Sequence, residues 1–184
     1  LQLASVHQAH LVGLFAISTP PMPRYADSEW SKALINASGT YLQEVESDVR
    51  RAFEAACSNY PDLSVEWRSD TSGVEGPVHA VELSARYADL VVSGQFERDN
   101  ASSHLPPGFA EDLVMHLARP MLVVPYAGKF RYPFERVFLA WDGSAQSMRA
   151  ASGALPLLKA ARDVHVGTFD VLAHPQIHGQ EPGA

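Results

Sequence analysis

The residues best placed for chemistry in this sequence form an Asp-Gly-Ser turn after a short apolar segment. Arg136–Trp141 has the pattern of a strand and Ser144–Ala161 that of a helix, with Asp142 and Gly143 between them. In α/β proteins, ligands bind beyond the carboxyl ends of parallel strands, where the next helix presents free backbone N–H groups. The Asp142 carboxylate could accept hydrogen bonds from a ribose hydroxyl or a base amine. Alternatively, the segment is a plain strand-to-helix turn in which Gly143 permits the bend and Ser144 caps the helix.

Other residues that could do chemistry have no suitable companions. The sequence contains no G-x-S-x-G, G-x-x-x-x-G-K-[S/T] or H-E-x-x-H motif. His174 and His178 are four apart, but the Pro and Gly residues around them disfavour the helix that a metal pair at this spacing needs. Cys57 is the single cysteine, so it forms no internal disulfide, and we expect a small buried or half-buried thiol near a helix end. We therefore expect no enzyme.

Composition excludes several classes of partner. The 184-residue chain carries a net charge of -7 and no block of like charges. Nucleic acids and anionic membrane surfaces require clustered basic residues, so neither is an expected partner. No apolar run approaches the roughly 18 residues of a membrane span. The low cysteine content indicates a reducing, cytoplasmic compartment.

The elements that must position the turn alternate between short apolar strands and amphipathic helices. Apolar segments that end at a Gly, Pro or polar residue predict strands at Leu11–Ile17, Leu63–Arg68, Asp89–Gly94, Met121–Val124 and Val164–Val171. Helical periodicity predicts helices over about 31–58, 77–88 and 106–119 between them. Leu63, Val65 and Trp67 alternate with polar residues, which is typical of an edge strand, whereas 89–94 and 121–124 resemble strands covered on both faces. This order predicts a parallel sheet with right-handed crossovers.

An internal repeat explains why the Asp-Gly-Ser turn comes so late. Leu155 lies 154 positions after Leu1, and at this offset five residues of 1–17 recur in 155–171, among them the Val-Gly pair at Val12 and Gly13. The repeat predicts a first domain over 1–128 that lacks its first strand, and the start of a second over 129–184. An empty position for that strand would leave neighbouring backbone groups unpaired. Residues before Leu1, or Arg136–Trp141 of the same or a neighbouring chain, are expected to fill it.

Three segments carry a resemblance to a known family. "RVFLAWDGSAQSMRAASGALPLL", "YADLVVSGQ" and "ARPMLVVPYAGKF" resemble the universal stress protein family in its tandem two-domain bacterial form. The resemblance implies a doubly wound, Rossmann-like α/β fold, with a five-stranded parallel sheet of order 3-2-1-4-5 and helices on both faces. Some members bind ATP and others do not, and no dedicated reaction defines the family. The chain is thus expected to be a non-enzymatic stress-response protein.

The resemblance also implies roles for single residues in nucleotide binding. Asp142, with Gly143 and Ser144, would hold the nucleoside, and backbone groups near Asp170 and Val171 would hold the adenine. ATP or AMP is therefore a candidate ligand of the second domain.

The phosphate-binding glycine motif of the family, by contrast, is poorly matched in the first domain. Gly94 fits its first position, but Glu97 and Pro107 replace the next two glycines, and Gly108 replaces the final Ser or Thr. Glu97 and Asp99 would also repel phosphate. We expect the first domain not to bind ATP in this way, while the corresponding loop of the second domain would lie past Ala184.

The fifth strand of the family pairs with another fifth strand between domains, which gives an alternative function. Here that strand is Met121, Leu122, Val123 and Val124, which carries no charge to protect an exposed edge. We expect a homodimer through it. The alternative to nucleotide binding is therefore a nucleotide-free module for interaction and dimerisation.

Overall fold

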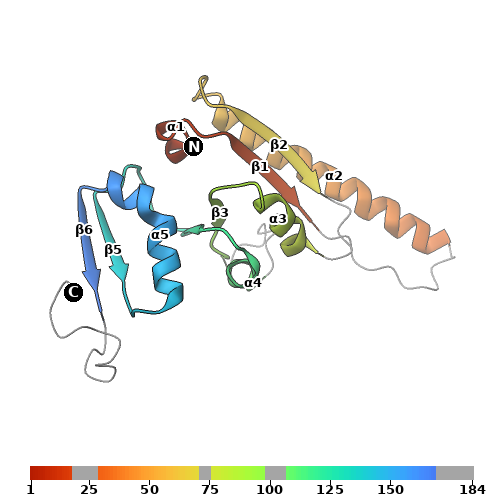
Figure 1. The fold of residues 1–184 in the computed structure, drawn as a ribbon. Coiled ribbons are helices and arrows are strands. Elements are labelled where there is room, and N and C mark those ends of the chain that lie inside the picture. Colours follow the sequence, from red (N-terminus) through yellow and green to blue (C-terminus); the bar gives the residue numbers. More distant parts are fainter. Residues whose placement is uncertain (18–28, 71–75, 98–106, 169–184) are drawn as a thin grey trace. The chain divides into compact units, whose positions relative to one another are not determined.

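The computed structural model describes residues 1–17, 29–70, 76–97 and 107–168 of a mixed α/β protein. All strands described in it pair in parallel (Figure 1). The chain divides into two compact units, Leu1–Tyr87 with Phe96–Leu117, and Ala88–Gln95 with Ala118–Ala184. The domain boundary expected at residue 128 was placed from the internal repeat, whereas these two units are defined by their compactness. The expected boundary therefore stays a prediction.

The first unit contains four helices and two strands among its described residues. They are α1 (Gln2–Val6), β1 (Leu11–Ala16), α2 (Glu29–Cys57), β2 (Val65–Asp70), α3 (Pro77–Ala85) and α4 (Phe109–His116). β1 and β2 are parallel, and Leu11 lies opposite Val65. Parallel strands need a long crossover connection, which α2 supplies. Pro77 lies in the first turn of α3, as predicted, because a proline there loses no helical hydrogen bond.

Aromatic side chains fill the space between α2 and the β1–β2 sheet. The Trp67 ring lies 5.5 Å from the Phe53 ring of α2 and 6.4 Å from the Phe15 ring of β1, measured between centroids. Gly13 faces the same rings, and a Cβ atom on it would lie 2.9 Å from Trp67 Cε3. Cys57 is buried at the end of α2, as predicted. This face of the sheet is the apolar one.

The second unit contains four strands and one helix among its described residues. They are β3 (Val91–Gly94), β4 (Met121–Val124), β5 (Arg136–Ala140), α5 (Ala145–Ala160) and β6 (Asp163–Gly167). β3 pairs with β4, and β5 pairs with β6 across the α5 crossover. The bounds agree with the predicted elements to within a few residues, except that the predicted last strand continued to Val171, which lies outside the described residues.

The strands form three separate two-stranded sheets, β1-β2, β3-β4 and β5-β6. The predicted single sheet of order 3-2-1-4-5 is therefore not confirmed. That order needs one strand paired with both β1 and β3, and no described strand does this. β5 pairs with β6 alone among the described strands, so the idea that it fills this position is not confirmed. Val92 and Val123 remain 54% and 39% exposed, so the prediction that 89–94 and 121–124 are covered on both faces is wrong.

The two copies of the repeat agree in element order. They differ in which neighbouring strand the backbone N–H and C=O groups of equivalent residues face. α1 ends at Val6 and α5 at Ala160, which are equivalent positions at the offset of the repeat. On a parallel strand, alternate residues direct their backbone groups to opposite neighbours. Leu11 N–H donates to Ser64 of the following strand, so odd-numbered residues of β1 face β2. The equivalent residues of β6 face the preceding strand, because Gly167 accepts from Trp141.

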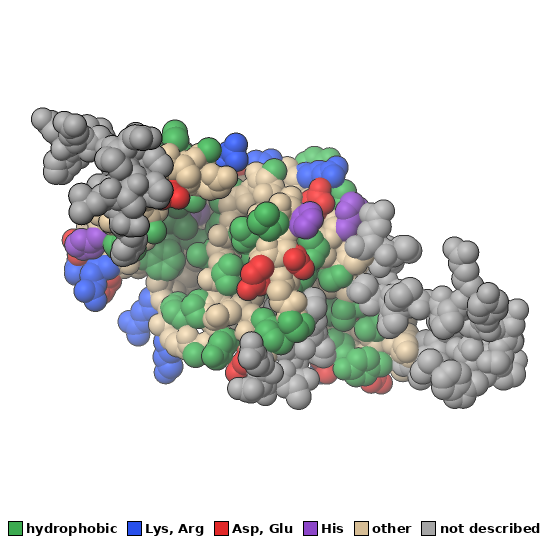
Figure 2. Space-filling view, turned by 90° about the horizontal axis from the view of Figure 1, so that it is seen from below, with side chains coloured by type: hydrophobic (Ala, Val, Ile, Leu, Met, Phe, Trp, Pro, Cys, Tyr) green, Lys and Arg blue, Asp and Glu red, His purple; other side chains and the backbone are tan. Residues whose placement is uncertain are grey.

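Many large apolar side chains of the described residues are exposed. Figure 2 shows hydrophobic side chains interspersed with carboxylates over the face in view. Phe138, Val164 and Val166 of the β5–β6 sheet are among the exposed residues. None of the described helices is both long enough and apolar enough to cross a membrane.

Candidate functional site

The Asp-Gly-Ser segment forms the predicted turn at the carboxyl end of β5. Gly143 has a φ of 74°, in the left-handed region that favours glycine. The Ser144 N–H donates to Asp142 Oδ1 at 2.9 Å, and Ser144 Oγ accepts from the Ser147 N–H at 3.1 Å. Ser144 is thus the N-cap of α5, as the alternative interpretation of this turn proposed. Both side chains organise the turn itself.

The electrostatics of the turn keep Asp142 ionised. Hydrogen bonds from Ser144, side chain first and then backbone, lower the pKa of Asp142 to about 2. The carboxylate is exposed, and an ionised carboxylate offers about four acceptor positions. Its role in the turn therefore leaves acceptor positions for a ligand hydroxyl or amine. This geometry is compatible with both interpretations of the segment.

The other residues predicted to bind nucleotide are not described by the structure, and their placement stays a prediction. Asp170 and Val171 lie outside the described residues, as does Asp99. Gly94 and Glu97 are the first two positions that were compared with the phosphate-binding glycine motif. Gly94 ends β3 in the second unit, whereas Glu97 belongs to the first unit.

The segment that replaces the phosphate-binding glycines leads into α4 and is acidic. Gly108, with a φ of 80°, immediately precedes α4. Glu111 and Asp112 then occupy the first turn of that helix. Carboxylates at a helix N-terminus oppose the binding of a phosphate there. The turn therefore supports the expectation that the first domain does not bind ATP in the manner of the family.

The four residues predicted to form a dimer interface make up β4. This strand pairs with β3 alone among the described residues, so its second edge carries unpaired backbone groups. Val123 is 39% exposed. An uncharged, partly exposed edge strand can pair with a strand from another chain. The interface stays a prediction.

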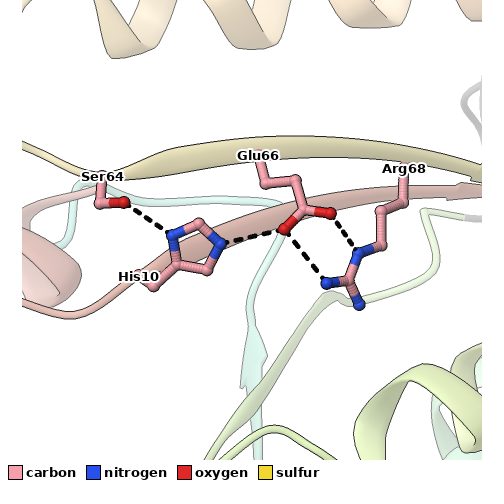
Figure 3. Close-up of polar contacts among 4 residues, drawn as sticks. All are labelled: His10, Ser64, Glu66 and Arg68. Carbon is pink, nitrogen blue, oxygen red and sulfur yellow. Dashed lines mark hydrogen bonds and ion pairs between the residues drawn. The ribbon is translucent and has the colours of Figure 1, made fainter.

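A polar cluster that sequence reasoning missed lies on the β1–β2 sheet (Figure 3). The His10 Nδ1 lies 2.8 Å from Ser64 Oγ, and its Nε2 lies 3.1 Å from Glu66 Oε2. Arg68 donates to the same carboxylate, from Nε to Oε1 at 2.6 Å and from Nη2 to Oε2 at 3.1 Å. Side chains alternate along a strand, so Glu66 and Arg68 lie on the face opposite Trp67 and α2. The cluster occupies the polar face of this sheet.

The charges in the cluster determine which way its hydrogen bonds run. Hydrogen bonds from Arg68, then from His10, lower the pKa of Glu66 to about 2. An ionised carboxylate only accepts hydrogen bonds, so the Nε2 of His10 must carry the proton shared with Glu66. In a neutral imidazole, Nδ1 then has a free lone pair and accepts from the Ser64 hydroxyl. The arrangement is a hydroxyl, a base and a carboxylate in series, the pattern of an activated nucleophile.

The sequence contained only half of the signal for this cluster. The alternation of Leu63–Arg68 places Ser64, Glu66 and Arg68 on one face. His10 lies 54 residues before Ser64, and the two meet only because β1 and β2 pair with Leu11 opposite Val65. A strand register of this kind is set by tertiary packing.

The described part of the chain holds no group of three or more His, Cys, Asp or Glu residues that could bind a metal ion. His174 and His178 lie outside it. Comparisons with models of known protein families, with curated proteins and with solved structures gave no match. The function of the chain is therefore inferred from its own residues and geometry.

Proposed function

We propose that the chain is a non-enzymatic protein of the universal stress protein type, spanning the first domain and the start of the second. Its strand pairing supports this. β1–β2 and β3–β4 correspond to the pairs 2-3 and 4-5 of the order 3-2-1-4-5, and β5–β6 corresponds to the pair 1-2 of a second domain. Each pair is parallel, as that doubly wound order requires.

We further propose that the second domain binds the nucleoside part of an adenine nucleotide at Asp142. The observation that carries this proposal is the turn itself. An ionised carboxylate stands at the carboxyl end of a parallel strand, beside the N-terminus of α5. This is where ligands of open α/β sheets bind. Binding here involves no chemical step.

Titration of the 184-residue chain with adenosine, AMP and ATP, followed by ligand-detected NMR, tests the proposal. We expect a Kd of about 1 mM, which corresponds to roughly 4 kcal/mol of binding free energy. Adenosine and ATP should bind alike, because the acidic segment after Gly94 offers the phosphates no site. Asp142→Asn keeps an acceptor for the Ser144 N–H but removes the charge, and it should weaken binding. Asp62→Asn, at an exposed site in the first unit, is the matched control.

Two results would count against these assignments. Micromolar ATP binding would show that the segment from Gly94 to Phe109 is a phosphate site after all. No response to adenosine at about 10 mM, ten times the expected Kd, would remove the ligand role of Asp142 and leave it as a turn residue.

The second candidate is a nucleotide-free module that dimerises through β4. The partly exposed Val123 and the free edge of β4 favour it. A dimer in sedimentation experiments together with a negative nucleotide titration would select this function. Either function is compatible with a reducing, cytoplasmic compartment, in which the buried thiol of Cys57 stays reduced.

A further inference from the structure

We propose that Ser64 is an acyl-acceptor site, whose hydroxyl takes the acyl group from a small reactive donor such as an acyl phosphate or an activated ester, with His10 as the base. This modification site lies in the first unit and uses none of the residues assigned to nucleotide binding. It is independent of the function proposed above.

The geometry supplies the three parts that an activated hydroxyl needs. Ser64 Oγ and His10 Nδ1 are 2.8 Å apart, within reach for direct proton transfer. Glu66 lies 3.1 Å from the other ring nitrogen. It holds the imidazole in the orientation in which Nδ1 carries no proton and its lone pair faces the Ser64 hydroxyl. Arg68 fixes the carboxylate through two hydrogen bonds (Figure 3). Glu66 is thus a positioning residue, whereas Ser64 and His10 take part in the reaction.

The transfer balances without any further reactant. Ser64 Oγ attacks the carbonyl carbon of the donor while its proton passes to His10 Nδ1. The bond between the acyl carbon and the leaving oxygen then breaks, and the leaving group departs as phosphate or alcohol. The imidazolium, which is next to the Glu66 carboxylate, returns the proton to the leaving group or to water. The products are an O-acyl serine and the released group, and no oxidation or reduction takes place.

The exposure of the cluster defines the class of donor. The side chains of His10 and Glu66 are 50% and 41% exposed, so a small molecule can reach Ser64 from solvent. An open strand face provides a base but little enclosure of the substrate. We therefore expect one acyl transfer per chain, from donors that carry a good leaving group, rather than repeated turnover. Acylation also removes the hydroxyl proton that Ser64 donates to His10.

The test uses p-nitrophenyl acetate on the full 184-residue chain, with intact mass measurement and peptide mapping. We expect a single acetyl group on Ser64. His10→Ala should slow the labelling of Ser64 about 100-fold, the lower end of what a positioned base contributes. Ser64→Ala should abolish the labelling of its peptide. Ser69→Ala, at an exposed serine of the adjoining strand β2, is the matched control and should label Ser64 at the wild-type rate.

Variants of Glu66 test its positioning role. Glu66→Ala should slow acetylation of Ser64, and Glu66→Gln should restore part of the rate, because its amide oxygen still accepts from Nε2–H. Circular dichroism checks that each variant is folded. The proposal fails if the acetyl group of the wild-type chain maps to lysine or to the N-terminus instead of Ser64. It also fails if folded His10→Ala labels Ser64 at the wild-type rate.

Discussion

Replacement of Gly13 by Ala tests the packing that joins β1, β2 and α2. A Cβ atom at this position would lie 2.9 Å from Trp67 Cε3 and 3.0 and 3.1 Å from two atoms of the Phe53 ring, whereas ordinary contacts begin at 3.4 Å. Both rings must therefore move, the Trp67 ring by about 0.5 Å and the Phe53 ring by about 0.4 Å. Trp67 is held between Phe15 and Phe53, so a shift of its ring disturbs both neighbours. Overpacking of this kind costs about 1–3 kcal/mol of the free energy of unfolding.

Urea denaturation, followed by tryptophan fluorescence and circular dichroism, measures this cost. With a denaturant slope of about 2 kcal/mol/M, the midpoint of Gly13→Ala should fall by about 0.5–1.5 M. Gly39→Ala is the matched control, because nothing lies within 4 Å of a Cβ atom at this position in α2. It should raise stability by about 0.5–1 kcal/mol, since Ala is the better helix former.

An unchanged midpoint for Gly13→Ala would refute the reasoning, because it would mean that the Trp67 and Phe53 rings do not close over this glycine. A decrease of equal size in both variants would show that loss of glycine, and not the clash, is responsible.

Three further predictions concern the second unit. The pKa of Asp142 is lower folded than unfolded, so its contribution to stability is complete above about pH 4 and is lost as the pH falls through about 2. Asp142→Asn should remove this acid dependence in unfolding measured from pH 5 downwards, and an unaltered profile would mean that other carboxylates cause it. Ser144→Ala should cost about 1 kcal/mol of helix stability by thermal denaturation, because it removes the N-cap, and Ser152→Ala in the exposed middle of α5 should not. Val123→Lys should give monomers in sedimentation experiments, because a charge would enter the β4 pairing edge, and an unchanged dimer would place the interface elsewhere.

Features that depend on neighbouring residues could be predicted from the sequence. The Asp-Gly-Ser turn forms as expected, because Gly143 adopts the left-handed conformation and Ser144 caps the helix that follows. β4 has the predicted bounds, and each end of α2 lies within two residues of the predicted end of that helix. The buried Cys57 at the end of α2 was also predicted. These features depend on local propensity, capping and short-range periodicity, which a few consecutive residues determine.

Features that depend on strand pairing could not be predicted from the sequence. Apolar strands indicated one parallel sheet, but the described strands form three pairs, because no described strand pairs with both β1 and β3. The cluster at His10 escaped notice for a related reason, since Ser64 becomes its neighbour only through the register of β1 and β2. The sequence by itself determined the local elements and the turn at Asp142. Tertiary structure alone decided which strands pair and in which register, since a shift of β2 by one residue would move the side chains of Ser64, Glu66 and Arg68 to the face opposite His10.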